Sequence, residues 1–593
     1  MRVTVSNRKM FLGGQRANMS CEFISELRRL SKLSAEAVQN LDYFDQLKEY
    51  MHIRRQTETD FRQLLLKIAE VNHKQLVLVC GSAGDGKSHL LSYLKYSDQD
   101  RILDSYKIIN DATESDAPNQ TAIETLAERI VAFRDDRLND GGREKVVLAI
   151  NLGMLNNFID SEQGKYFGKL KQYVLNNNIF SVAQPLPFNK DEVFYHIDFS
   201  NYQLYTLTAD GARSDYLNEL LEKVFGNNTC NPFYNTYINQ GLTCPHHTQC
   251  PVRHNFEFLM KEDVRKLLIQ RIIEVCIKDK LVITSRDVLN FIFDAVVSPD
   301  FDEKKLWNLL SNPAKFLETY ISYTTPMLIF ENRGTSSLID CMTESAANSD
   351  DIENRDCDIL DFYATDDIAP IVLSVLNGSK YSDILHIMGL SAIDNSRDPL
   401  KKYVYKFLRN YKKLTDGQEL KADKLYLSFV QDLYHAYAGN VKYLKNLYSS
   451  VKYSIYSWNG TYGTDLICID DSSDDYSILE QLNIKYDVAY GSGDDEVLQF
   501  APVIMVRFSN ETKTEQVSFS IDYSLYRVIM AMKDGYCPSS QDRNVHADFS
   551  SGIMALSEFG TKKSRVYIVS KRKMSNMKFL LEESDFGYSF KEV

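Results

Sequence analysis

The chain has 593 residues, of which 44% are hydrophobic and 25% charged, and its formal net charge is −13. This composition is ordinary for a globular protein of about three or four domains, and it argues against extensive disorder. The acidic balance argues against a general polyanion binder, so any contact with nucleic acid would need a local basic patch or a partner subunit.

Targeting and membrane signals are missing from the sequence pattern. Residues 1–9 lead into only a brief apolar stretch, which is not the pattern of a signal peptide. No segment approaches the ~18 uninterrupted apolar residues that a membrane span requires. The ten cysteines are spread over the chain and form no disulfide framework. We therefore expect a cytoplasmic protein that makes no contact with a membrane.

The N-terminal residues 1–72 are predicted to form a helical arm. Apolar residues recur at three- and four-residue spacing in residues 21–30 and again in residues 60–70. The second stretch runs directly into the next apolar segment. We therefore expect this arm to pack against the core that follows it.

The most specific pattern of the chain lies in residues 75–88. A short apolar run, residues 75–80, precedes Gly81-x-x-x-x-Gly86-Lys87-Ser88, and residues 88–96 have the pattern of an amphipathic helix. This is the order of a phosphate-binding loop: glycines let main-chain N–H groups surround a phosphate, and the helix start adds its positive dipole end. Lys87 would add a mobile charge and Ser88 a ligand for Mg²⁺.

We predict an ATP site with Mg²⁺ at this loop. The alternative is a glycine-rich turn that merely packs against a neighbouring segment. The predicted nucleotide-binding residues are Gly81, Ser82, Ala83, Gly84, Asp85, Gly86, Lys87, Ser88 and His89.

Strand and helix patterns alternate through residues 73–200. Expected strands are residues 75–80, 106–111, 145–151 and 193–199, and expected helices are residues 88–96, 121–135 and 165–176. Such alternation predicts an α/β core of the P-loop NTPase type, a parallel sheet with helices on both faces. Ligands of that architecture lie at the carboxyl ends of the strands.

Candidate catalytic groups follow these strands. Hydrolysis of a nucleotide needs a carboxylate near Mg²⁺ and a group that positions water. Asp111 and Glu114 follow the second strand and are the first choice, with Asp111 also a ligand of Mg²⁺; Asp198 ends the fourth strand and is the second choice. Asn151 ends the third strand, where it suits a sensor of the γ-phosphate better than a metal ligand. Each of these side chains could instead cap the helix that follows.

Residues 201–300 combine a Cys/His insertion with a predicted helical lid. Thiolates and imidazole are the preferred ligands of tetrahedral Zn²⁺, and the insertion contains Cys230, Cys244, Cys250 and His254, with His246 and His247 as alternative ligands. The first gap is long and no Cys-x-x-Cys pair is present, so ordinary buried cysteines remain the alternative.

Two arginines of this region could complete the nucleotide site. Arg286 opens a lid helix and Arg253 follows Cys250. Either could reach a γ-phosphate in the same chain or in a neighbouring subunit, which leaves a homo-oligomer open. A surface salt bridge is the alternative for both.

The rest of the chain is predicted to form a helical domain, residues 301–460, and a C-terminal α+β domain, residues 461–593. Residues 344–367 are acidic and read as a linker or exposed loop. Two basic stretches, residues 401–413 and 562–578, could touch a nucleic-acid backbone. A solvated basic face is an equally good interpretation.

Four segments together resemble the DptF (DndF) family, the P-loop component of bacterial DNA-phosphorothioation-dependent restriction systems. They are residues 78–91, 110–115, 149–158 and 250–255, so the specific resemblance covers about the first 300 residues. It implies a cytoplasmic antiviral defence complex with DptG- and DptH-type partner subunits that attacks DNA lacking phosphorothioate. It also carries nucleotide binding onto Gly81, Gly84, Gly86, Lys87 and Ser88.

Two hypotheses follow from this resemblance and from the motif. The first is an ATPase subunit whose nucleotide cycle drives or gates a DNA-restriction complex. The second is a nucleotide-bound scaffold that does not hydrolyse and acts as an assembly switch. The sequence supplies no acidic pair at the end of the third strand, which favours the second modestly.

Overall fold

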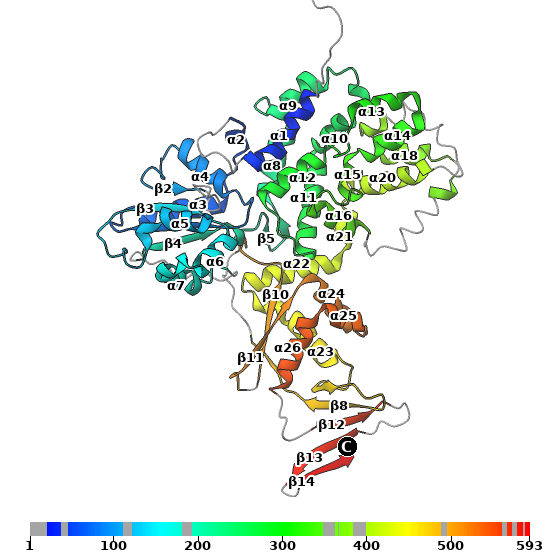
Figure 1. Cartoon of the computed structure of the whole chain (residues 1–593). Helices are drawn as coiled ribbons and strands as arrows, with labels where there is room; N and C mark the ends of the chain where they lie inside the picture. Colours follow the sequence, from blue (N-terminus) through cyan, green and yellow to red (C-terminus); the bar gives the residue numbers. More distant parts are fainter. Residues whose placement is uncertain are drawn as a thin grey trace, which may run out of the picture.

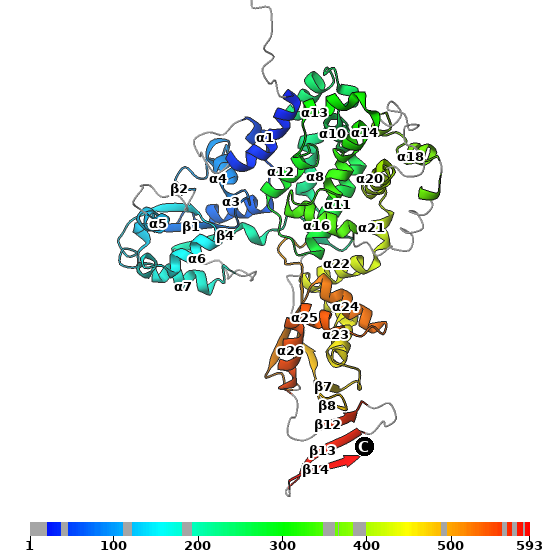
Figure 2. The same ribbon diagram turned by 45° about the vertical axis from the view of Figure 1, so that its right-hand side comes forward.

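The computed structural model describes residues 21–36, 46–110, 121–180, 192–347, 362–365, 367–383, 399–487, 495–510, 512–559, 566–571, 578–584 and 587–592. Figures 1 and 2 show an α/β core on one side, a large helical body beside it and a C-terminal part below them, with strands at its far end. The described residues include no helix that is both long and apolar enough to cross a membrane.

The core is built on a four-stranded, all-parallel sheet with the strand order β2-β3-β1-β4. Every residue of β1 is buried, as expected for a central parallel strand covered on both faces. The strands are β1 (Gln75–Cys80), β2 (Lys107–Ile109), β3 (Lys145–Ala149) and β4 (Phe194–Asp198).

Helices cover both faces of this sheet, which confirms the predicted α/β core. Alternate residues of β1 point to opposite faces: Leu76 and Leu78 join one apolar cluster, and Val77 and Val79 join another. The first cluster is closed by α5, α6 and α7, and the second by α3 and α4. Their bounds are α3 (Gln56–Ile68), α4 (Lys87–Tyr96), α5 (Ala122–Arg129), α6 (Leu152–Asp160) and α7 (Gly168–Asn176).

A buried histidine of β4 gives the core a predictable response to acid. The imidazole of His196 lies 2.9 Å from the Tyr173 hydroxyl, and burial lowers its pKa from 6.5 to about 4. The unfolded chain therefore takes up a proton between these values that the folded chain does not. The stability gained from the neutral imidazole is complete above pH 6.5 and is lost as pH falls from 6.5 to 4.

We expect the free energy of unfolding to fall in this window by about 1.4 kcal/mol per pH unit from this histidine. Urea titrations at a series of pH values measure the slope. The matched variant is His196→Gln, which can still bond Tyr173 but does not titrate, and it should show a shallower slope. An unchanged slope in that variant would contradict the assignment.

The predicted N-terminal arm divides between two parts of the molecule. Helix α3 packs on the sheet, as expected, whereas α1 packs against α9 and α12 of the helical body. The two other helices of the arm are α1 (Glu22–Glu36) and α2 (Gln46–Met51).

The helical body shares one continuous apolar cluster with much of the C-terminal part. Its long central helix is α11 (Glu262–Lys278), which packs on α8, α16 and α20. The region begins with a small hairpin, β5 (Thr206–Thr208) and β6 (Gly211–Arg213), and its other helices are α8 (Asp215–Phe225), α9 (Pro232–Thr236), α10 (Pro251–Leu259), α12 (Ser285–Asp294), α13 (Glu303–Asn308), α14 (Pro313–Ser322), α15 (Thr325–Phe330), α16 (Ser337–Ala347), α18 (Ala369–Val375), α20 (Pro399–Thr415) and α21 (Gln418–Ala422).

The C-terminal part, from α22 onward, mixes helices and antiparallel strands. A three-stranded sheet has the order β11-β10-β9, and a five-stranded sheet has the order β14-β13-β12-β8-β7. The elements are α22 (Lys424–Tyr437), α23 (Lys445–Ser457), β7 (Leu466–Asp470), β8 (Tyr476–Gln481), β9 (Lys485–Asp487), β10 (Ile504–Ser509), β11 (Gln516–Ile521), α24 (Tyr523–Lys533), α25 (Ser540–Val545), α26 (Ala547–Ser557), β12 (Val566–Ser570), β13 (Lys578–Ser584) and β14 (Gly587–Glu592).

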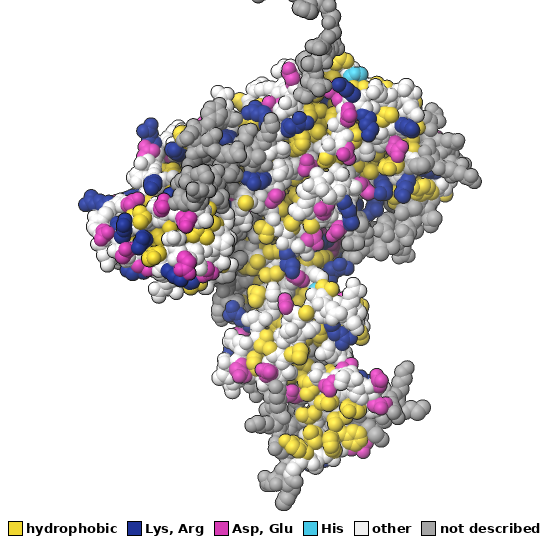
Figure 3. Space-filling model, viewed as in Figure 1, with side chains coloured by type: hydrophobic (Ala, Val, Ile, Leu, Met, Phe, Trp, Pro, Cys, Tyr) yellow, Lys and Arg dark blue, Asp and Glu magenta, His cyan; other side chains and the backbone are white. Residues whose placement is uncertain are grey.

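Some lysines of the two basic stretches make structural contacts. Lys401 and Lys413 on α20 are buried, and Lys401 donates to the main-chain oxygens of Tyr363 and Thr365. Lys571 bonds the main-chain oxygen of Ser473 and pairs with Asp471. Most of the second stretch lies outside the described residues. On the face seen in Figure 3, basic and acidic side chains are interspersed rather than gathered by sign.

Candidate functional site

The glycine-rich loop, residues 81–86, joins β1 to α4 at the carboxyl edge of the sheet. Gly81, Gly84 and Gly86 have φ angles of 146°, 94° and 92°, a region that residues with a Cβ seldom adopt. Gly86 is also the N-cap of α4, and no side chain bonds the first N–H groups of that helix from the cap position. The backbone therefore adopts a loop conformation that favours glycine at these three positions, and the loop leads directly into the N-terminus of α4.

Hydrogen bonds within the loop fix its shape. The Ser82 N–H donates to Oδ2 of Asp85 at 2.5 Å and to the Ser200 hydroxyl at 3.0 Å. The Lys87 ammonium donates to the Ser82 carbonyl at 2.6 Å. Asp85 thus closes the loop from inside, and Lys87 lies across its mouth.

The two charges of the loop lie close together, and Asp85 is buried while Lys87 is half-buried. Burial raises the pKa of the Asp85 carboxyl, although the neighbouring Lys87 ammonium opposes that shift. Burial likewise lowers the pKa of Lys87, against the pull of Asp85. The charged form of each side chain is therefore stabilised by the other. An anion placed beside Lys87 would compete with the Asp85 carboxylate for the Lys87 ammonium.

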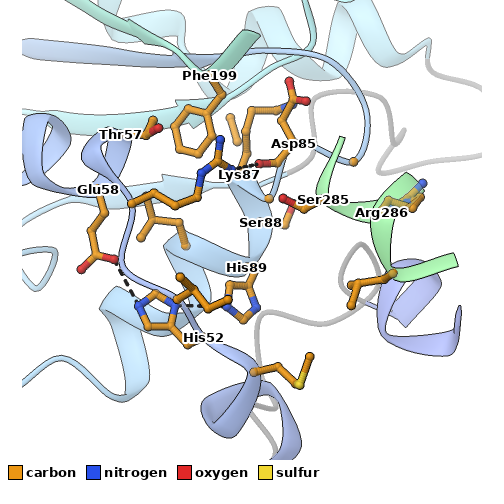
Figure 4. A pocket seen from close by; sticks show the side chains of 18 of the residues that line it. His52, Thr57, Glu58, Asp85, Lys87, Ser88, His89, Phe199, Ser285 and Arg286 are labelled. Atoms are coloured by element: carbon orange, nitrogen blue, oxygen red, sulfur yellow. Dashed lines mark hydrogen bonds and ion pairs between the residues drawn. The ribbon is translucent and has the colours of Figure 1, made fainter. Parts of the chain in front are cut away.

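The loop opens into a pocket of about 380 Å³, within the size range of small-molecule sites. Figure 4 shows that its walls come from separate parts of the chain: Lys87 and Ser88 from the start of α4, His52 and Glu58 from the arm, Phe199 from the end of β4, and Ser285 and Arg286 from the start of α12. The sequence motif supplies only one of these walls.

The arm contributes a buried polar chain that reaches the helix after the loop. The imidazole of His52 lies 3.2 Å from that of His89, and 3.1 Å from the Glu58 carboxylate. Glu58 in turn accepts a hydrogen bond from Arg62 at 2.9 Å. Burial, followed by the nearby His52, lowers the pKa of His89 to about 4, so its imidazole is neutral near pH 7.

Strand ends supply two asparagines, of which Asn151 was predicted as a site residue and Asn110 was not. Asn151 and Asn110 both line the pocket. The side-chain oxygen of Asn151 caps α6 by accepting from the Met154 N–H at 2.7 Å. This cap leaves the Asn151 amide nitrogen as its donor group. The side-chain oxygen of Asn110 is buried and has no hydrogen-bond partner within the described residues.

Of the three candidate carboxylates, the structure describes only Asp198. Asp111 and Glu114 lie outside the described residues. Asp198 is aligned with Cys80 in the sheet and accepts from the Ser200 N–H at 2.9 Å. Burial raises the pKa of Asp198. Asp198 therefore lies at the loop, partly engaged in the turn that follows β4.

The two candidate arginines have different positions. Arg286 lines the pocket, and its main-chain N–H donates to the Gly84 carbonyl at 3.4 Å. In its side chain, the buried Nε has no hydrogen-bond partner within the described residues. Arg253 does not line the pocket; its guanidinium binds Glu257 and the His247 carbonyl, each at 2.8 Å. The structure thus places Arg286 at the site and gives Arg253 a local structural role.

Sequence reasoning missed the arm and α8 as walls of the pocket. Arg55 donates to the Asp85 carbonyl at 3.2 Å and lies 5.2 Å from the ring centre of Tyr216 on α8. The buried Thr57 hydroxyl faces the pocket without a partner in the described part of the chain. No motif marks these residues, because their role depends on the packing of the arm.

The predicted zinc ligands are not gathered by the fold. No three His, Cys, Asp or Glu side chains among the described residues form a group that could hold a metal ion. His254 is buried and lies 2.7 Å from the Tyr320 hydroxyl, and Cys230 is exposed. The thiol of Cys21 on the arm, and not that of Cys230, lies near Cys244 and Cys250. Burial and then these neighbouring thiols raise the pKa of Cys250 to about 12. The four residues therefore do not fit the expected zinc site.

The fold and the site together define an α/β protein with a glycine-rich loop and a half-buried lysine at the carboxyl edge of a parallel sheet. Comparison with protein-family models, curated proteins and solved structures finds no significant match for this chain.

Proposed function

We propose that this chain is a Mg²⁺-dependent ATPase subunit of a bacterial DNA-restriction complex that acts on DNA lacking phosphorothioate. The glycine-rich loop carries the nucleotide part of the proposal. Three of its glycines have positive φ, and two of them, Gly84 and Gly86, line a 380 Å³ pocket together with the start of α4 and Lys87. Main-chain N–H groups, a helix N-terminus and one ammonium are the groups that hold a polyphosphate.

The residues that surround the loop fit the other needs of a nucleotide. Beyond Lys87 the pocket is lined by the cationic side chains Lys48, Arg55 and Arg286, and its lining also includes the apolar side chains Met51, Ile53, Leu220 and Leu289. Cations suit the phosphates and apolar walls suit a base. Mg²⁺, when bound, would bridge phosphate oxygens and neutralise their charge, with Ser88 and a strand-end carboxylate as its ligands from the protein.

Each nearby side chain can be given a role. Lys87 would exchange the Ser82 carbonyl for phosphate oxygens, and Arg286 would approach the terminal phosphate from α12. Asn151 would donate from its amide nitrogen, since its carbonyl is used by the α6 cap. Asp111, Glu114 or Asp198 would orient water.

The DNA and partner parts of the proposal rest on the family resemblance. The mixed charge of the surface in Figure 3 and the net charge of −13 favour contact with DNA through partner subunits of the DptG and DptH type. A nucleotide-bound scaffold without turnover is the second candidate. It is favoured by the asparagine that replaces a carboxylate at the end of β3.

One set of measurements separates the two candidates. Calorimetry with MgATP tests binding, and steady-state hydrolysis is measured alone and with DNA that carries or lacks phosphorothioate. Turnover that responds to the state of the DNA supports the ATPase, whereas tight binding without turnover supports the scaffold. Absence of binding to any Mg²⁺–nucleotide would contradict both.

For Asn151 we expect a loss of turnover with binding preserved. Asn151→Ser keeps a side-chain oxygen for the α6 cap but removes the amide donor, so kcat should fall about tenfold or more while KM changes little. The control is Asn156→Ser, within the same helix and exposed to solvent, which should behave as the wild type. Equal loss of binding and of turnover in Asn151→Ser would argue against a sensor role.

A further inference from the structure

The segment between α11 and α12 touches two distant parts of the molecule. We call residues 278–286 the lid connector; it begins at the last residue of α11 and ends in the first turn of α12. One end contacts two helices of the C-terminal part, and the other end contacts the glycine-rich loop. In Figures 1 and 2 the C-terminal part extends away from the α/β core below the helical body.

Lys278 joins the connector to α22. Its ammonium lies 2.7 Å from Glu274 and 2.7 Å from Oδ2 of Asp423, and about 5 Å from the ring centres of Tyr426 and Tyr523. Asp423 uses its other oxygen, Oδ1, to cap α22 by accepting from the Tyr426 N–H. Burial opposes the charge of Lys278, yet the carboxylate of Glu274 and its other neighbours raise the pKa of the ammonium above its ordinary value.

Lys280 repeats this arrangement at α24. Its ammonium lies 2.6 Å from Oδ2 of Asp522, whose Oδ1 caps α24 by accepting from the Leu525 N–H at 2.9 Å. Lys280 has a φ of 53°, an uncommon value for a residue with a side chain. The caps of two helices of the C-terminal part, α22 and α24, therefore hold the beginning of the connector.

The far end of the connector lies on the glycine-rich loop. A Cβ added to Gly84 would meet the Thr284 hydroxyl at 2.8 Å and the Arg286 Cβ at 3.0 Å. Thr284 caps α12 in a reciprocal pair with Asp287, so the first turn of that helix is held rigidly. A shift of the connector would move Arg286 relative to the loop.

A second segment makes the same pair of contacts. The Ser200 hydroxyl accepts from the Ser82 N–H of the loop, and three residues later Gln203 donates to the carbonyls of Leu498 and Phe500. Leu207 then pairs with Val497 through two main-chain hydrogen bonds. The loop is thus linked to the C-terminal part on both sides.

We propose that Lys278 and Lys280 are positioning residues through which the C-terminal part sets the position of Arg286 on the glycine-rich loop. The proposal rests on the proposed nucleotide site and adds a coupling to it. Binding of nucleotide at the loop tightens the caps of α22 and α24, and a partner that moves these helices alters nucleotide affinity by the same factor.

The test replaces the two cap carboxylates by amides. The variant Asp423→Asn/Asp522→Asn keeps both caps, since asparagine caps as well as aspartate, but weakens both ion pairs. The control is Lys266→Met, which removes an exposed ion pair with Glu262 on the same helix α11. Nucleotide affinity is measured by calorimetry, and hydrogen exchange is followed in the first turns of α22 and α24 with and without MgATP.

In the wild type and in Lys266→Met we expect MgATP to slow exchange at these two helix starts. In the double variant that protection should disappear and the dissociation constant should rise about fivefold. If the double variant melts without a folded baseline, Lys280→Met answers the same question, because this side chain is half exposed.

The outcomes separate the coupling from the nucleotide site. If the wild type binds nucleotide and the double variant keeps its affinity and protection, the coupling is wrong and the site stands. If the wild type binds no nucleotide, both are overturned.

Discussion

Replacing Lys87 with alanine is expected to weaken MgATP binding by about 10- to 100-fold and to abolish turnover. A hydrogen bond from a charged donor contributes about 1.5 to 3 kcal/mol, and about 1.4 kcal/mol corresponds to a tenfold change in affinity. The ammonium of Lys87 lies at the mouth of the glycine-rich loop and donates there to the Ser82 main-chain carbonyl. Calorimetry and a phosphate-release assay measure the two effects.

The matched control for this variant is Lys95→Ala. Lys95 lies in the last turn of the same helix and is exposed, so its loss removes a positive charge without touching the loop. Both variants should melt at similar temperatures. If Lys95→Ala weakened binding as much as Lys87→Ala, the effect would be a general loss of charge and the loop would lose its assigned role.

Replacing Gly84 with alanine is expected to have the second large effect, on stability as well as binding. The φ of 94° strains a residue with a Cβ, and the added carbon would lie 2.8 Å from the Thr284 hydroxyl and 3.0 Å from the Arg286 Cβ. Backbone strain of about 1 to 2 kcal/mol and overpacking of about 1 to 3 kcal/mol should together lower the free energy of unfolding by about 2 to 5 kcal/mol.

Gly535→Ala separates these two contributions. Gly535 has a similar φ of 97°, and an added Cβ would meet no atom within 4 Å. It should therefore show the backbone strain alone and leave nucleotide binding unchanged. Equal destabilisation by both variants would mean that the contact between α12 and the loop is loose, which would also weaken the case for the lid connector. Denaturant titrations and calorimetry on the same samples decide this.

The position of Arg286 on the loop bears on the choice between ATPase and scaffold. Arg286 lines the pocket, and its main-chain N–H bonds the Gly84 carbonyl, so the backbone of this residue is held at the loop before nucleotide binds. A backbone that is already in place favours turnover, because only the side chain has to be repositioned toward a phosphate. The missing carboxylate at the end of β3 favours the scaffold, so the hydrolysis measurement remains the deciding one.

The sequence by itself determined the local parts of the site. The apolar run, the glycines and Lys87 fix a strand, a loop and a helix within about 20 residues, and the buried run of β1 and the periodicity of α4 appear as predicted. The alternation of strands and helices likewise predicted the parallel sheet. These features depend on backbone freedom and on short-range periodicity, which a single sequence displays directly.

Only the tertiary structure decided which distant residues complete the pocket and which do not. Thr57 from the arm, Tyr216 from α8 and Arg286 from α12 meet at the loop although they are separated by up to 229 positions in the numbering of the chain. The same folding places Cys21 rather than Cys230 beside Cys244 and buries two lysines of a stretch that looked like a nucleic-acid face. Such meetings depend on how helices pack, and packing is set by the whole apolar surface rather than by residue spacing.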